Sequence, residues 1–343
     1  MSLTRAGVRT RTCKIEASYS PGWFVSTAPR KSRLTSLLGG SKTCAVCATV
    51  FETEYVYQRY ATPGVVYDVC SPDCRELLVA RLTGATVEPK RAMHRIAVLN
   101  QKGGTGKTTT SVNLAAGLAE AGHRVLLIDA DPQGHCAISL GVRGRRDFYD
   151  VLIDGADPAA CIVSARENLD LLSSSERLAS AEVLLARRQG DRQTLMRTRL
   201  QQLQGYDYVI VDCGPSLSLL NTNVLLYCGE LLVPVACDYL SLVGVRHIMR
   251  TLGRLKEHFS HDVELLGFLP TMYDRRNKIS EESVALLQSR YPDEVLEPIR
   301  INASLKEAPS HQASIFEYDP DSRGATDYRE LVGELVRRHT SGS

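Results

Sequence analysis

The sequence lacks long apolar runs, a large excess of one charge and an abundance of aromatic residues. No run of roughly 18 or more apolar residues occurs, so the pattern predicts no transmembrane helix. The first residues include arginines but no apolar stretch after them, so we expect no secretory signal peptide. A net charge of +2 does not by itself indicate a nucleic-acid partner. With 343 residues, 43% of them hydrophobic, the chain is long and apolar enough for a sizeable core.

The most informative stretch is residues 100–109, which read NQKGGTGKTT. It follows an apolar run at 96–99 and precedes a segment with helical character at 111–121. A glycine-rich turn between a strand and a helix lets backbone N–H groups surround a polyphosphate. The pattern predicts that Lys107 contacts the β- and γ-phosphates of ATP and that the Thr108 hydroxyl binds Mg²⁺. The remaining predicted ATP-binding residues of the loop are Lys102, Gly103, Gly104, Thr105, Gly106 and Thr109.

The loop departs from the strict phosphate-loop pattern at its first position. That position is Gln101 instead of glycine, and a second lysine, Lys102, follows it. The variant KGGTGKTT resembles the deviant Walker A box of the ParA/MinD family of dimerising ATPases. The resemblance implies that Lys102 crosses the interface of an ATP-bound homodimer and reaches the nucleotide of the partner.

Carboxylates follow two further apolar runs. Residues 126–135 read LLIDADPQGH and contain Asp129 and Asp131, and residues 206–216 read YDYVIVDCGPS and contain Asp212. An aspartate after an apolar strand is typical of the Walker B motif, which holds Mg²⁺. The matching family motif implies that Asp131 orients the attacking water and that Asp129 supports the magnesium shell indirectly. We therefore predict Lys102, Lys107 and Asp131 as catalytic residues, and Thr108, Asp129 and Asp212 as the magnesium site.

The apolar runs alternate with helical segments through most of the chain. Most of the runs are continuous, as expected for strands buried on both faces of a parallel sheet. The pattern predicts a doubly wound α/β P-loop NTPase domain over residues 95–339, with its catalytic groups at the carboxyl ends of the strands. The predicted strands are 96–99, 125–128, 169–172, 208–211, 231–235 and 265–269.

Four cysteines in residues 43–84 predict a separate small zinc module. Cys44 and Cys47 form one pair, and Cys70 and Cys74 form a second pair in VCSPDCRELL, where Ser71 can cap a helix. A turn and a helix start can supply four thiolates to a tetrahedral Zn²⁺, as in treble-clef or zinc-ribbon fingers. Four thiolates leave no open position, so we expect a structural role. An iron–sulfur cluster and four unrelated cysteines remain alternatives.

Two polar segments flank this module. Residues 1–42 are rich in arginine and lysine with a single acidic residue, which predicts a mostly disordered basic arm. That arm is either a solvated tail or a non-specific phosphate contact. Residues 85–94 predict a polar linker to the ATPase domain.

The C-terminal segments extend the resemblance to chromosome-type, Soj-like ParA proteins. They read LPTMYDRRNK, ASLKEAPSH and FEYDPDSRGATDY. The resemblance implies ATP-dependent homodimerisation, non-specific DNA binding by the dimer, and slow hydrolysis that a ParB-like or cargo-adaptor partner stimulates. It also implies that Pro309 lies in the adenine pocket. Two departures are Gly214, where the family usually has proline, and Ser304, where it usually has a DNA-contacting arginine.

The expected DNA surface rests on basic residues. Arg276 keeps the family's basic position in the TMYDxR loop. Backbone phosphates need no base readout, so scattered Arg and Lys residues suffice for non-specific binding. The other candidates are Arg275, Lys278, Arg246, Arg250, Arg300 and Lys306.

These observations predict a cytoplasmic, nucleoid-associated partition or positioning ATPase with ATP, Mg²⁺ and Zn²⁺ as cofactors. Its cargo would be a chromosome, a plasmid or a protein assembly. One alternative is an iron–sulfur carrier ATPase. Another is a MinD-like ATPase acting on a membrane, but we expect residues 328–338 to be a packed helix and not a membrane anchor.

Overall fold

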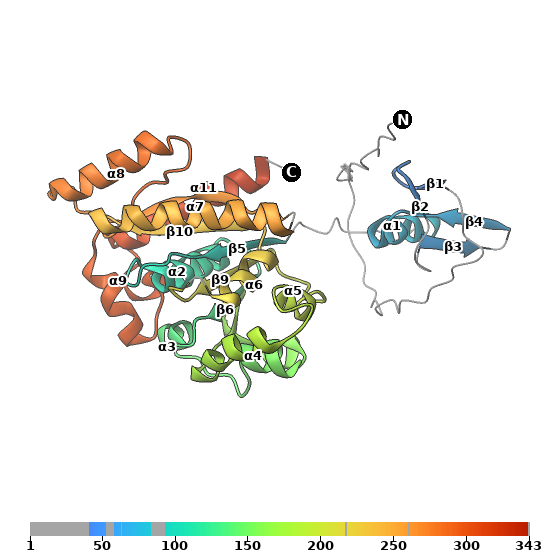
Figure 1. The fold of residues 1–343 in the computed structure, drawn as a ribbon, viewed down its shortest axis with the longest axis horizontal. Coiled ribbons are helices and arrows are strands. Elements are labelled where there is room, and N and C mark those ends of the chain that lie inside the picture. Colours follow the sequence, from blue (N-terminus) through green and yellow to red (C-terminus); the bar gives the residue numbers. More distant parts are fainter. Residues whose placement is uncertain are drawn as a thin grey trace. The chain divides into compact units, whose positions relative to one another are not determined.

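The computed structural model describes residues 41–52, 58–62, 64–83, 93–216, 218–259 and 261–341. The chain divides into two compact units, Met1–Arg91 and Ala92–Ser343. The predicted basic arm lies outside the described residues except for Ser41 and Lys42, and the predicted linker except for Met93 and His94. Figure 1 shows the elements of both units.

The part of the small unit that the structure describes contains two short hairpins and one helix. Strands β1 (Ser41–Thr43) and β2 (Val50–Glu52) pair antiparallel, as do β3 (Arg59–Thr62) and β4 (Val65–Asp68). Helix α1 (Pro72–Thr83) follows, and Ser71 caps it by accepting a hydrogen bond from the Cys74 N–H at 3.1 Å. The buried apolar cluster of its described residues is small: Cys44, Val69, Cys74 and Leu78. A core of this size does not normally stabilise a fold without a disulfide, a bound metal or oligomerisation.

The large unit is built on a seven-stranded sheet in the order β11-β10-β5-β9-β6-β8-β7. All recorded pairings are parallel except that of β7 with β8. This confirms the predicted mostly parallel α/β sheet, and each of the six predicted strands is present. The strands are β5 (His94–Val98), β6 (Val125–Ala130), β7 (Val163–Arg166), β8 (Leu169–Leu172), β9 (Tyr208–Cys213), β10 (Glu230–Ala236) and β11 (Glu264–Thr271).

Helices cover both faces of the sheet (Figure 1). One buried cluster joins the sheet to α5, α6 and α7, and a second joins it to α2 and α11. Strand β6 is buried along its whole length, as its continuous apolar run predicts. The helices are α2 (Lys107–Glu120), α3 (His135–Leu140), α4 (Ala181–Arg187), α5 (Leu195–Arg199), α6 (Leu219–Tyr227), α7 (Tyr239–Phe259), α8 (Lys278–Arg290), α9 (Ala303–Glu307), α10 (Ile315–Tyr318) and α11 (Arg323–Ser341).

The last helix packs as expected. Leu331, Val332 and Leu335 of α11 are buried in the cluster shared with α2. An apolar face that is already covered in this way is not available to a bilayer. Among the described residues, no helix combines the length and the apolar character needed to cross a membrane.

Candidate functional site

The glycine-rich loop lies between the end of β5 and the start of α2. Asn100 is fully buried and ties the loop to its neighbours, because its Nδ2 donates to the Pro234 carbonyl at 2.7 Å and its Oδ1 accepts from the Lys102 N–H at 3.1 Å. Gly104 and Gly106 have φ values of 73° and 80°, in the region where side chains are strained. Glycine at these two positions therefore lets the backbone turn around a ligand and begin α2 immediately after it.

Lys107 is the first residue of α2 and is largely buried. Its Nζ donates to the Lys102 carbonyl at 3.1 Å. Burial lowers the pKa of Lys107, and the negative charges of Asp212 and Asp131 oppose that shift. A desolvated ammonium group at a helix start is suited to bind an anion such as a phosphate.

Three predicted carboxylates meet at the carboxyl ends of β6 and β9. Asp129 and Asp212 are partners in the register of these strands and are both fully buried. Oδ2 of Asp212 accepts from the Thr108 hydroxyl at 2.7 Å, and Oδ1 accepts from the Ser111 hydroxyl at 2.8 Å. Asp129 accepts from the backbone N–H groups of Asp131 and Cys136, each at 3.0 Å. The structure thus brings these carboxylates to the loop, as their positions after apolar strands predict.

The electrostatics of this group favour a bound cation. Burial raises the pKa of Asp129 to about 7, with the nearby charge of Asp212 adding to the effect. Burial likewise raises the pKa of Asp212, although hydrogen bonds from Thr108 and Ser111 oppose the shift. Two buried carboxylates beside a threonine hydroxyl are oxygen donors of the kind that Mg²⁺ takes, so the residues present fit this ion.

The loop after β9 approaches Asp131 closely. A Cβ atom added at Gly214 would lie 3.5 Å from the Asp131 carboxylate, which is an ordinary contact distance. A larger residue therefore fits at this position, and glycine here leaves the loop less restricted than the proline usual in the family.

Lys102 makes an ion pair that the sequence did not predict. Its Nζ lies 2.7 Å and 2.6 Å from the two carboxylate oxygens of Asp238, which directly precedes α7. The side chains are 35% and 45% exposed, so the pair is screened by water and is weak. Lys102 is thus held by its own chain in the single protomer, by a contact that can be exchanged.

A cavity of about 240 Å³ adjoins the loop on the side of α3 and α9. Pro309 lines it together with Thr108 and Thr109, which places the predicted nucleobase residue beside the predicted phosphate residues. The remaining lining residues are Val112, Asn113, His135, Ile138, Ser139, Leu305, Ala308 and Ala313.

The predicted DNA-contacting residues differ in how they are engaged. Arg276 and Lys278 are highly exposed, at 88% and 86%, and their recorded ion pairs are with the nearby residues Asp274 and Glu282. Arg300 instead grips the buried Asp327, with Nη2 at 2.5 Å and Nε at 3.0 Å from Oδ1. This pair ties Arg300 to α11, so a phosphate would have to displace it. Four further candidates are exposed: Arg246, Arg250, Arg275 and Lys306.

Ser304 performs a local structural role where the family usually has a basic residue. Its hydroxyl donates to Asp319 at 2.6 Å, and its N–H donates to Asn302 at the start of α9. The hydroxyl is therefore committed to the fold of this segment and adds no positive charge to the surface.

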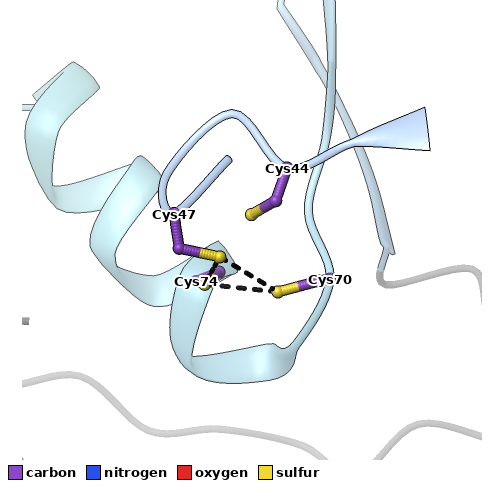
Figure 2. Close-up of side chains that lie close together, drawn as sticks. All are labelled: Cys44, Cys47, Cys70 and Cys74. Carbon is purple, nitrogen blue, oxygen red and sulfur yellow. Dashed lines mark hydrogen bonds between the residues drawn. The ribbon is translucent and has the colours of Figure 1, made fainter. Parts of the chain in front are cut away.

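The four cysteines of the small unit converge on one point (Figure 2). The Sγ–Sγ distances are 3.4 Å for Cys47–Cys70, 3.6 Å for Cys70–Cys74 and 3.8 Å for Cys74–Cys47, and Cys44 completes a group within 4.8 Å. Four thiolates at about 2.3 Å from a tetrahedral Zn²⁺ stand about 3.8 Å apart. The observed spacing therefore fits a single bound zinc ion.

Several residues of the site were not predicted from the sequence. Ser111 lies four residues after Lys107 in α2, and this spacing could have predicted that both side chains lie on the same face of the helix. Asn100, Cys136 and Asp238 carried no local signal, because their side chains contact Pro234, Asp212 and Lys102 respectively, which are far away in the sequence.

The chain is similar to known proteins over its large unit. Residues 93–265 match the model of a family described as AAA domain. The sporulation initiation inhibitor protein Soj of Bacillus subtilis is 40% identical over 246 residues, which cover 70% of this chain and 97% of the relative. The chromosome-partitioning ATPase Soj of Thermus thermophilus is also 40% identical, over 72% of this chain and 96% of the relative.

A solved structure agrees with these relatives. The cobyrinic acid a,c-diamide synthase of Mycobacterium smegmatis, with a bound ATP analogue and magnesium, has a TM-score of 0.64 at 35% identity and covers 74% of this chain and 98% of its own. The parallel sheet, the loop with Lys107 and the paired carboxylates Asp129 and Asp212 agree with this likeness. The chain belongs to the ParA/Soj family of P-loop ATPases.

Proposed function

We propose that this protein is a partition or positioning ATPase that dimerises on binding ATP and Mg²⁺. The ATP-bound homodimer binds DNA non-specifically, and a ParB-like or cargo-adaptor partner stimulates hydrolysis and so releases it. The cargo is a chromosome, a plasmid or a protein assembly. The names of the Soj relatives, one of them a chromosome-partitioning ATPase, support this assignment.

The second lysine of the loop carries the proposal. Lys107 is buried at the start of α2, where we propose that it binds the phosphates of its own protomer. Lys102 lies at the loop surface, 35% exposed, and makes a weak, screened pair with Asp238. A lysine in this position can leave Asp238 for the phosphates of a second protomer, which makes dimerisation depend on nucleotide.

Each residue of the site has a separate proposed role in phosphoryl transfer. Lys107 binds and orients the phosphates, and Asp131 holds the attacking water. Thr108 and Asp212 would hold Mg²⁺, with Asp129 supporting them from behind. When bound, that ion neutralises charge on the phosphate oxygens. The rate of hydrolysis then depends on how well the site positions the phosphates and the attacking water. A slow rate suits an ATPase that times the lifetime of its ATP-bound state.

Freeing Lys102 is expected to promote dimerisation. Asp238→Ala removes the pair in the single protomer, so the ATP-bound dimer should form at a protein concentration lower by up to about fivefold, the value of a screened pair. Sedimentation with a slowly hydrolysed ATP analogue measures the shift. Asp262→Ala is the matched control, because it removes an exposed pair with Lys256 on α7. Dimerisation that is unchanged or weaker in Asp238→Ala contradicts this role.

Non-specific DNA binding is expected only in the ATP state. A gel shift with duplex DNA of arbitrary sequence should appear with the analogue, vanish with ADP and weaken steeply with salt. Log affinity falls as log salt concentration rises, and Arg276→Ala should reduce the magnitude of this slope by about 1 for each arginine removed. Arg290→Ala, an exposed arginine at the other end of α8, should leave the slope unchanged. Equal binding with ATP analogue and ADP contradicts the proposal.

The small unit is proposed to be a structural zinc module with Cys44, Cys47, Cys70 and Cys74 as ligands. The spacing of the sulfur atoms supports this ion. We propose that the module recruits a partner or cargo, or extends the DNA contact together with the basic arm. Deleting residues 1–90 should then impair partner or DNA binding and leave nucleotide binding intact.

A further inference from the structure

Three potential metal ligands meet at the amino ends of the sheet strands, at the opposite end from the nucleotide loop. His94 begins β5, Glu230 begins β10 and His339 lies near the end of α11. Nδ1 of His94 is 2.8 Å from Oε1 of Glu230, and Nε2 of His339 is 3.3 Å from Oε2. The three ligand atoms lie within 4.8 Å of one another. Because the nucleotide loop follows the other end of β5, this cluster is separate from the ATP site.

The chemistry and burial of the cluster suit a metal ion. Two imidazoles and one carboxylate are ligands for Zn²⁺ and similar divalent ions, with a fourth position left for water. The side chains of His94, Glu230 and His339 are only 22%, 14% and 9% exposed. A carboxylate in such a place is costly unless it is paired or binds a metal. Oε2 of Glu230 is itself buried, and its recorded contact within the described ranges is the ion pair with Nε2 of His339.

A second layer of contacts orients one of the imidazoles. The Tyr208 hydroxyl lies 3.1 Å from Nδ1 of His339, which leaves Nε2 directed at Glu230. Metal-bound histidines are normally held in this way, with the other ring nitrogen engaged by an oxygen atom. Tyr208 begins β9, between β5 and β6, so the sheet itself positions this support.

The two imidazole rings stack, with centroids 3.7 Å apart and planes 14° apart. One ion cannot lie in the planes of two parallel rings, so binding requires one ring to turn about its Cβ–Cγ bond. That torsion has a broad energy profile. His94 is the more exposed of the two, so we expect its ring to be the one that turns.

We propose that His94, Glu230 and His339 form a second metal site in this chain, one that takes Zn²⁺ or a chemically similar ion such as Co²⁺. The site would clamp the first residue of the ATPase sheet to the last helix. It involves neither the nucleotide nor the four cysteines, and it does not depend on the proposed partition function.

Cobalt titration of the full chain, after chelator treatment, tests the site. With ADP and excess Mg²⁺ present to occupy the nucleotide site, the wild type should bind two Co²⁺ ions, one with the intense charge-transfer absorption of a thiolate site and one without it. His339→Gln should keep the thiolate absorption and weaken the other site by at least about 100-fold, because a ligand is lost. Tyr208→Phe, which removes only the supporting hydroxyl, should weaken it about 10-fold.

A neighbouring histidine provides the matched control. His123 contacts the Tyr208 ring edge-on at 5.1 Å and is not part of the ligand group, so His123→Gln should still bind two ions. A wild type that binds only the thiolate-coordinated ion overturns the proposal. So does a His339→Gln variant whose second site is unaffected while the protein remains folded by circular dichroism. In either case the cluster is a hydrogen-bonded clamp only.

Discussion

Lys107→Ala is expected to lose both the ATP-bound dimer and turnover, whereas Asp131→Ala is expected to stop turnover and keep the ATP-bound dimer. Removing a buried charged partner costs about 2 kcal/mol or more, so ATP affinity should fall by about 30-fold or more in Lys107→Ala. A residue that holds the attacking water contributes about 10²- to 10⁴-fold to the rate, and Asp131→Ala should lose that factor. Phosphate release and sedimentation with ATP measure the two effects.

The two variants separate binding from chemistry because their contacts differ. Lys107 lies inside the loop, while Asp131 lies beyond the end of β6, where its carboxylate accepts only the Gln133 N–H at 3.0 Å among the hydrogen bonds recorded for it. Asp157→Ala is a suitable control, since Asp157 caps a distant short turn through the Ala159 N–H. Normal hydrolysis in Asp131→Ala would show that another group positions the water.

Removing the metal from the small unit is expected to unfold it without disturbing ATP binding. Structural zinc contributes about 10–16 kcal/mol to the folding of comparable small domains, and the described core here has only four buried residues. Cys74→Ser should therefore lose bound zinc and become sensitive to protease within residues 41–83. Elemental analysis and limited proteolysis measure these changes, and nucleotide affinity should stay within about twofold of the wild type if the units fold independently.

Cys161→Ser is the matched control for this experiment. Cys161 is buried in the large unit and lies outside the cysteine cluster, so its loss should leave the zinc content unchanged. Iron with visible absorption in place of zinc would favour the iron–sulfur alternative. A small unit that stays protease-resistant after chelation contradicts a metal-dependent fold.

Features that depend on residues close together in the sequence could be predicted from the sequence. Residues 102–108 specify the loop through their glycines and lysines, and the continuous apolar runs specify the buried parallel strands. The strand β7 was missed because its four residues include Ser164 and Arg166, and only pairing with β8 makes them a strand. It is also the one antiparallel strand of this sheet among the described residues.

The fold class, the nucleotide loop and the four-cysteine cluster could all be predicted from the sequence, because each depends on spacing within a short segment. The long-range partners that complete them could be found only in the folded chain. Lys102 meets Asp238 across 136 positions, and Glu230 lies between His94 and His339. Such contacts arise when separate strands enter one sheet, and no local pattern records which strand ends become neighbours.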